Sequence, residues 1–174
     1  SVAVNVSALE LRQRRYADGV RAALQETGLE PYRLILEITE SALIQDPIVT
    51  AALLKELKQI GVSISIDDFG TGYSSLIYLT KFPISEIKID RSFIFSINSS
   101  EIYKIIIGSI IELGHKLGTN VVAEGVEDVG QLRFLRENHC DEGQGFLFSP
   151  PIGAELFSEM LSVGSYASGG KSRS

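Results

Sequence analysis

Hydrophobic and polar positions along the chain follow two periodicities in turn. Short apolar runs rich in β-branched residues, typical of buried strands, occupy positions 2–6, 34–39, 62–67, 86–90 and 120–123, with a weaker run at 143–148. Segments with helical spacing lie between them, the first at 8–27 and later ones ending near positions 61, 117 and 138. Strands that alternate with helices form parallel sheets with right-handed crossovers, so the pattern predicts an α/β protein of six βα units.

Cap and turn residues mark several of these helix boundaries. Gly28 ends the first helical segment, and Asp46 and Pro47 begin the next one as N-cap and first-turn proline. Gly61 ends that second segment, and Gly118 closes the long apolar one that follows. The boundaries leave no low-complexity linker between the units, so the chain is expected to form one domain.

Six units are compatible with two architectures. One is a doubly wound open sheet, which would be complete as it stands. The other is a (β/α)8 barrel that lacks its first part, because such barrels usually need about 250 residues. Periodicity alone leaves both architectures open.

Composition limits the classes of partner. The 174 residues are 44% hydrophobic and 22% charged, which is ordinary for a soluble globular domain. A net charge of −6 argues against general affinity for DNA or RNA, so a phosphate ligand would need metal ions or local donors. The single cysteine, Cys140, fits a reducing compartment, and we expect the cytoplasm. No apolar run reaches the roughly 20 residues of a membrane span, although other domains could attach the parent protein to a membrane.

Polar and acidic side chains occur where the predicted strands end. They are Asn5 in the first run, Glu37 and Glu40, Asp67 and Asp68, Lys88 and Asp90, Glu124 and Glu127, and Gln144 in the last. The carboxyl ends of parallel strands lie on one face, which in a barrel is the mouth. A buried carboxylate is unfavourable unless it is paired, hydrogen-bonded or bound to metal. The pattern therefore predicts a functional site on this face.

Each of these residues also has a purely structural interpretation. Glu40 could cap the helix that follows it, Asp68 could cap a turn at Gly70, and Lys88 could simply pair with a carboxylate. The adjacent Asp67 and Asp68, however, repel one another unless a cation lies between them. With no cluster of histidine and cysteine to suggest zinc, the acids together indicate a site for Mg²⁺ or Mn²⁺. Such a site suits two-metal phosphodiester hydrolysis, in which a lysine orients or deprotonates the attacking water.

Several motifs in series give the chain a family resemblance. They are NVS at 5–7, LEITE at 36–40, DDFGTGYSSL at 67–76, KIDRSF at 88–93, VAEGVE at 122–127 and QGFLFS at 144–149. In this order they resemble the EAL family of cyclic di-GMP phosphodiesterases. The resemblance covers residues 1–161, which we expect to form the domain, and leaves 162–174 as an expected disordered tail.

The resemblance implies both a fold and an activity. The fold is a modified (β/α)8 TIM-like barrel, here truncated at its N-terminus to about six βα units. The preceding part, with the Glu-Ala-Leu motif and its metal-binding glutamate, is expected to be missing. The implied activity is metal-dependent hydrolysis of cyclic di-GMP to linear pGpG in bacterial second-messenger signalling. The alternatives are a non-catalytic cyclic di-GMP receptor and an inactive truncated fragment of an EAL domain.

Roles follow from the resemblance, position by position. Asn5, Glu37 and Asp67 are implied ligands of one metal ion, and Asp67, Asp68 and Glu124 of a second, with Lys88, Glu124 and Asp68 as the catalytic residues. The implied substrate-binding or supporting residues are Gln144, Asp90, Glu127, Glu40, Phe69, Gly70, Thr71 and Gly72. The loop at 69–76 resembles one that couples metal binding to dimerisation, so a homodimer is expected, with Glu40 anchoring the loop.

One departure from the family pattern concerns a turn. His139 stands where the family usually has a glycine, immediately before Cys140. We interpret this exchange as minor. The sequence EGVED at 124–128 in place of the commoner EGVET is a second small departure.

Overall fold

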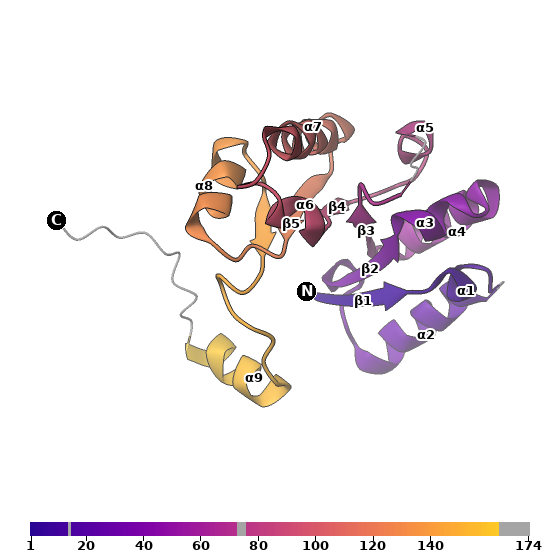
Figure 1. The fold of residues 1–174 in the computed structure, drawn as a ribbon. Coiled ribbons are helices and arrows are strands. Elements are labelled where there is room, and N and C mark those ends of the chain that lie inside the picture. Colours follow the sequence, from indigo (N-terminus) through magenta and orange to yellow (C-terminus); the bar gives the residue numbers. More distant parts are fainter. Residues whose placement is uncertain (14, 73–75, 164–174) are drawn as a thin grey trace.

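Six parallel strands form one sheet whose order follows the chain (Figure 1). They are β1 (Val2–Val6), β2 (Leu34–Thr39), β3 (Ser63–Phe69), β4 (Glu86–Ile89), β5 (Asn120–Glu124) and β6 (Glu142–Gln144). Each strand pairs in parallel with the next one along the sequence. A doubly wound sheet reverses its strand order at a switch point, whereas a barrel adds its strands in sequence. The order therefore confirms the TIM-like alternative.

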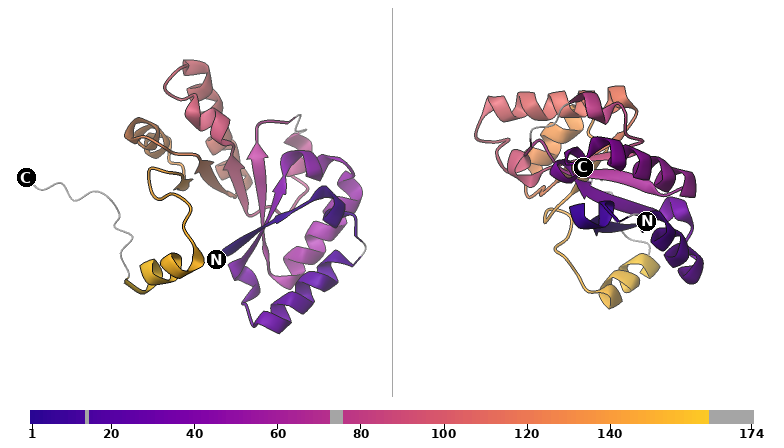
Figure 2. Two further views of the ribbon diagram at one scale, coloured as in Figure 1. Left: turned by 60° about the horizontal axis from the view of Figure 1, so that its bottom comes forward. Right: turned by 90° about the vertical axis from the view of Figure 1, so that its right-hand side faces the viewer.

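The computed structural model describes residues 1–13, 15–72 and 76–163. The predicted loop at 69–76 is thus described only in part, and most of the predicted tail at 162–174 lies outside the described residues. The sheet curls into an open half-barrel whose edge strands, β1 and β6, do not pair with each other in these ranges (Figure 2). None of the helices in these ranges combines the length and apolar character that crossing a bilayer requires.

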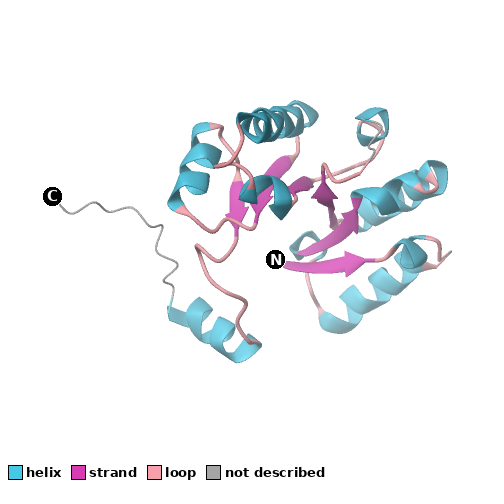
Figure 3. Ribbon diagram, in the orientation of Figure 1, coloured by secondary structure: helices cyan, strands magenta, loops and turns pink. Residues whose placement is uncertain are grey.

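Helices connect the strands and most of them cover the outside of the curled sheet, whereas the last helix lies apart from the sheet (Figure 3). They are α1 (Ala8–Leu11), α2 (Tyr16–Thr27), α3 (Glu40–Ile44), α4 (Pro47–Ile60), α5 (Leu76–Leu79), α6 (Arg91–Phe95), α7 (Glu101–Leu117), α8 (Val129–Glu137) and α9 (Ala154–Val163), with a 3-10 turn at Pro31–Arg33. The predicted glycine ends are confirmed, because Gly28, Gly61 and Gly118 all adopt the left-handed conformation at helix C-termini.

The hydrophobic core lies between the outer face of the sheet and these helices. Ile38, Ile64 and Ile87 point outward from three neighbouring strands and are fully buried, as are Leu54 of α4 and Ile107 of α7. Successive side chains of a strand point to opposite faces, so the intervening positions face the inside of the curl. The core thereby leaves the inner face free for polar residues.

The prediction of one helix over 8–27 is wrong. Helix α1 ends at Leu11, and α2 begins only at Tyr16. A straight helix of that length would extend about 30 Å, whereas a five-residue strand extends only about 17 Å. The chain therefore has to turn back early to pack Ala17 and Leu24 into the core, where both are buried. The segment at 12–15 contains no glycine or proline that would have marked the break.

The last strand is shorter than its predicted range of 143–148. It ends at Gln144 because the chain turns at Gly145, where a Cβ atom would lie 2.3 Å from the backbone of Val126. The Phe148 N–H then donates to the Gly145 carbonyl at 3.0 Å. Helix α9, which was not predicted, continues to Val163, past the expected domain end at 161. The division into domain and tail remains a prediction.

His139 occupies a backbone conformation that favours glycine. Its φ is 60°, in the left-handed region, directly after α8. The Cys140 N–H donates to the Leu135 carbonyl at 2.9 Å, which is the hydrogen bond of a Schellman turn. His139 therefore fills the position that a glycine takes most easily at a helix end.

We expect His139→Gly to stabilise the domain. The substitution removes the steric conflict of a Cβ atom in the left-handed conformation, and part of this gain is offset by the greater freedom of glycine in the unfolded chain. The free energy of unfolding should rise by about 0.5–1 kcal/mol, measured by urea denaturation. A variant that is equally or less stable would contradict this account of the turn.

Candidate metal-binding active site

Lys88 is the centre of the polar cluster at the barrel mouth. It projects inward from β4 and is 6% exposed. Its Nζ lies 2.6 Å from Glu124 Oε1 on β5 and 2.8 Å from Glu37 Oε1 on β2. A third carboxylate, Asp67 of β3, lies 3.4 Å away. Four neighbouring strands thus direct one ammonium and three carboxylates to the same point.

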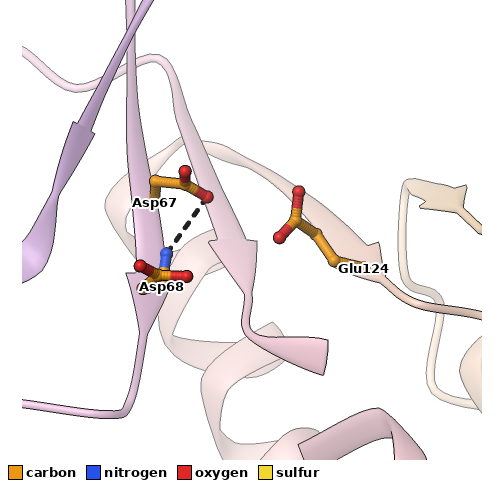
Figure 4. A group of neighbouring side chains, drawn as sticks. All are labelled: Asp67, Asp68 and Glu124. Carbon is orange, nitrogen blue, oxygen red and sulfur yellow. Dashed lines mark hydrogen bonds between the residues drawn. The ribbon is translucent and has the colours of Figure 1, made fainter. Parts of the chain in front are cut away.

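The adjacent Asp67 and Asp68 contribute to one site because the backbone of β3 is irregular. Neighbouring strand residues normally point to opposite faces. Here the pairing of β3 with β4 shifts register between Ile66 and Phe69, and Asp68 has a φ of 54°. A bulge of this kind redirects a side chain. The Asp68 N–H donates to Asp67 Oδ1 at 3.1 Å (Figure 4).

The bulge completes a group of three carboxylates. Asp67, Asp68 and Glu124 each offer an oxygen, and these oxygens lie within 4.8 Å of one another. Figure 4 shows the aspartates of β3 and Glu124 of β5 facing each other across the mouth. An all-oxygen donor set suits hard divalent cations, so the residues present fit the predicted class of metal.

Crowding of negative charge perturbs the ionisation of the cluster. Burial, and then repulsion from Asp67 and Asp90, raises the pKa of Asp68. Burial also raises the pKa of Glu124, although its hydrogen bond with Lys88 acts in the opposite direction. For Lys88 itself, burial lowers the pKa, but hydrogen bonds to its carboxylate partners outweigh burial and raise the pKa above its ordinary value. One lysine therefore leaves the cluster short of positive charge.

Two further predicted site residues, the proposed metal ligand Asn5 and the proposed substrate-binding residue Gln144, lie on strands that flank this group. Asn5 of β1 is in register with Glu37 of β2, and Gln144 of β6 is in register with Glu124 of β5. Both therefore share the inner face with the cluster. No side-chain hydrogen bond holds either residue within the described part of the chain.

Glu40 contacts the loop that follows β3. It is the first residue of α3 and is 2% exposed, and its Oε2 accepts a 2.8 Å hydrogen bond from the Gly70 N–H. Its Oε1 has no hydrogen-bond partner among the described residues, and a Cβ atom at Gly72 would lie only 2.8 Å from it. Phe69 is buried nearby, and the Thr71 hydroxyl donates to the Asp68 carbonyl at 2.8 Å. Glu40 thus contacts the loop and does not act as a helix cap.

Asp90 and Glu127 differ in how they are held. Asp90 caps α6, where it accepts from the Ser92 N–H at 3.0 Å and from the Ser92 hydroxyl. Glu127 is fixed through its backbone, whose N–H donates to Gln131 Oε1 at 2.7 Å. Its carboxylate is exposed and has no partner within the ranges that the structure describes.

A partly buried pair beneath the cluster was not predicted. The Ser65 hydroxyl, which is completely buried, donates to Glu86 Oε1 at 2.8 Å. Burial raises the pKa of Glu86. The sequence contained a signal for this pair, because polar residues occupy every second position of β3 and β4. Ser65 and Glu86 therefore share the inward face with Asp67 and Lys88.

Comparison with known proteins decides the family. The model of the EAL domain family matches residues 1–151, which include every residue of the cluster. The chain belongs to the EAL domain family. The resemblance seen in the motifs is thereby confirmed, as is the barrel fold.

Several relatives are closely similar in sequence and structure. The cyclic di-GMP phosphodiesterase NbdA of Pseudomonas aeruginosa is 49% identical over 92% of the chain, which spans 20% of NbdA. The phosphodiesterase MucR of the same organism, solved in complex with cyclic di-GMP, is 46% identical over 90% of this chain and 64% of the MucR chain, with a TM-score of 0.87. BlrP1 of Klebsiella pneumoniae, solved with cyclic di-GMP and manganese, is 34% identical over 86% of this chain and 38% of its own, with a TM-score of 0.80. A second BlrP1 complex contains calcium.

We expect divalent cations to stabilise the domain through this cluster. Mn²⁺ at about 100 times its dissociation constant should raise the melting temperature by about 5 °C or more. Asp67→Asn should lose most of this shift, because the amide cannot replace a charged ligand. Glu26→Gln, which substitutes an exposed residue of α2, is the matched control and should show the full rise in melting temperature. Equal shifts in both variants would rule out the cluster as the binding site.

The raised pKa of Asp68 leads to a second prediction, which concerns the metal-free domain in EDTA. Folding disfavours the ionised form of the Asp68 carboxyl group, so the free energy of unfolding falls as the pH rises through the raised pKa of Asp68. Asp68→Asn should therefore increase the free energy of unfolding at pH 7.5, and asparagine tolerates the left-handed backbone there. The gain should shrink as the pH falls towards the ordinary aspartate pKa of 3.8. A gain that is absent, or that grows in acid, would contradict the charge repulsion described here.

Proposed function

We propose that this domain hydrolyses cyclic di-GMP to linear pGpG with the help of two divalent cations, Mg²⁺ or Mn²⁺. The observation that carries the proposal is the convergence of Glu37, Asp67 and Glu124 on Lys88 at the barrel mouth, with Asp68 brought alongside by the bulge. The relatives named above, which include phosphodiesterases for this dinucleotide, support the choice of substrate.

The cluster divides naturally into two groups of metal ligands around a shared aspartate. Asn5, Glu37 and Asp67 would hold one cation, and Asp67, Asp68 and Glu124 the other. When bound, such a pair of cations lowers the pKa of a bound water and stabilises charge that develops on the phosphate oxygens. An acidic protein needs that positive charge to accept a dinucleotide with two phosphates.

Lys88 contributes a hydrogen-bond donor and a positive charge to the same place. Its carboxylate partners favour the ammonium form, as the direction of its pKa shift indicates. An ammonium within 2.6–3.4 Å of three of the proposed ligands can hold a water against the scissile phosphate and stabilise the transition state electrostatically. Its rigid burial keeps this donor in position before substrate arrives.

The remaining predicted residues are assigned supporting roles. Gln144, Asp90 and Glu127 border the mouth and would contact or position the substrate. Glu40, through its hydrogen bond to Gly70, would report the state of the mouth to the loop at 69–76. A homodimer formed near that loop, and a cytoplasmic location, belong to the same proposal.

The direct test is an incubation of the protein, with whatever flanking sequence its gene encodes, with cyclic di-GMP and Mg²⁺ or Mn²⁺. Chromatography should show linear pGpG, and EDTA should abolish its formation. Asp67→Ala and Glu124→Ala should each lower kcat by more than about 100-fold, since even residues that only support metal ligands are worth 10–100-fold. Glu26→Gln should leave kcat unchanged.

Two outcomes would contradict the proposal. Near-normal rates in both alanine variants would show that the cluster is not the reaction centre. Tight binding of cyclic di-GMP by the wild type without any turnover would assign the domain to the receptors that bind this dinucleotide and do not cut it.

A further inference from the structure

A second layer of polar side chains lies below the catalytic cluster on the inner face of the sheet. Ser65 of β3 is in register with Glu37 of β2 on one side and with Glu86 of β4 on the other. Glu86 precedes Lys88 by two residues, so both side chains leave β4 on the same face. The Glu86 carboxylate therefore stands one step below the central ammonium of the site.

The Glu86 carboxylate is held at one oxygen and open at the other. Its Oε1 accepts the 2.8 Å hydrogen bond from the Ser65 hydroxyl, whereas its Oε2 has no hydrogen-bond or ion-pair partner within the described ranges of the chain. Burial raises the pKa of Glu86, and the Ser65 hydrogen bond and the nearby charge of Lys88 act in the opposite direction. Glu86 thus offers a half-buried acceptor, fixed in place, to a further donor.

Metal binding would change the partners of Lys88. All three carboxylates that lie 2.6–3.4 Å from its ammonium are proposed metal ligands. Together with Asp68 they carry four negative charges, which two divalent cations would neutralise. The Lys88 ammonium would then lie beside two cations without a counter-charge, and a buried charge without a partner is strongly unfavourable. Another carboxylate within reach of Lys88 would therefore stabilise the metal-bound site.

Two carboxylates of the described strands face the inside of the curl without being proposed ligands, and they differ in burial. Glu142 of β6, two residues before Gln144, is exposed, so water screens its charge. Glu86 is half-buried and lies on the same strand as Lys88. Charges interact more strongly where less water surrounds them. Glu86 is therefore the better placed of the two to compensate the ammonium.

We propose that Glu86 is a positioning residue, which binds the Lys88 ammonium once metal ions occupy the carboxylates that hold it in this structure. One N–H of the ammonium donates to Glu86 Oε2, and its other two donors remain for the attacking water and the phosphate. The Ser65 hydroxyl fixes the carboxylate, and the carboxylate in turn fixes the lysine before substrate arrives. This inference rests on the proposed function of the cluster above it.

A crystal grown with Mn²⁺ and no substrate tests this exchange of partners independently of turnover. The protein should carry whatever flanking sequence its gene encodes. Lys88 Nζ should lie within about 4 Å of a carboxylate oxygen of Glu86, the usual limit for an ion pair. A longer distance, with manganese at the barrel mouth, overturns the inference. Absence of manganese from the mouth overturns it together with the proposed function.

Kinetics at saturating Mn²⁺ test the same role in catalysis. Glu86→Gln keeps the size of the side chain and an acceptor for the Ser65 hydroxyl but removes the charge. It should lower kcat about 10-fold and leave KM unchanged, because Lys88 acts on the transition state. Glu142→Gln, which removes the exposed carboxylate of the same face, is the matched control and should retain the wild-type kcat.

The outcomes separate this inference from the proposed function. Equal kcat values in Glu86→Gln and Glu142→Gln overturn the inference, even where the wild type hydrolyses cyclic di-GMP. If the wild type binds Mn²⁺ but does not hydrolyse cyclic di-GMP, the catalytic proposal fails, and the distance from Lys88 Nζ to Glu86 still decides the inference.

Discussion

The balance of charge around Lys88 is the constraint on which the rest of the structure depends. Three strands direct carboxylates to within 2.6–3.4 Å of one ammonium, at a depth where an unpaired charge would be strongly unfavourable. This arrangement needs the strands in strict sequential order, so that β2, β3, β4 and β5 are neighbours. It also needs an outer face that supplies most of the hydrophobic core, since much of the inner face is given to polar groups.

Local backbone conformations complete what the strand order begins. Asp68 takes the left-handed conformation at a bulge, so that two adjacent aspartates serve one site. Gly125 allows the loop after β5 to lie against α6, and Glu40 holds Gly70 through a buried carboxylate oxygen. Of these features, only the conformation of Asp68 is unfavourable in itself, because a positive φ is uncommon for a residue other than glycine. It persists because the surrounding structure enforces it.

The sequence predicts the strands and the acidic mouth because both depend on local patterns. Polar and apolar residues alternate from Glu86 to Ile89, for example, and this alternation places Lys88 on the inner face of its strand, whichever strands pair with it. The end of α1 at Leu11 was beyond prediction, since it follows from the length of the neighbouring strand and not from any breaker residue. Helices of four or five residues, such as α6, are too short to show a period. The bulge at Asp68 and the contact between Gly125 and Arg91 arise from tertiary packing, which one sequence does not display.

The central claim is that the excess carboxylates around Lys88 exist to hold two cations that share Asp67. A crystal of the protein grown with Mn²⁺ and cyclic di-GMP would test it by anomalous scattering, which locates manganese directly. The account predicts two manganese peaks at the barrel mouth, one on each side of Asp67, with the second peak also bound by Asp68 and Glu124. A single peak, or peaks that leave Asp67 without a metal contact, would contradict it.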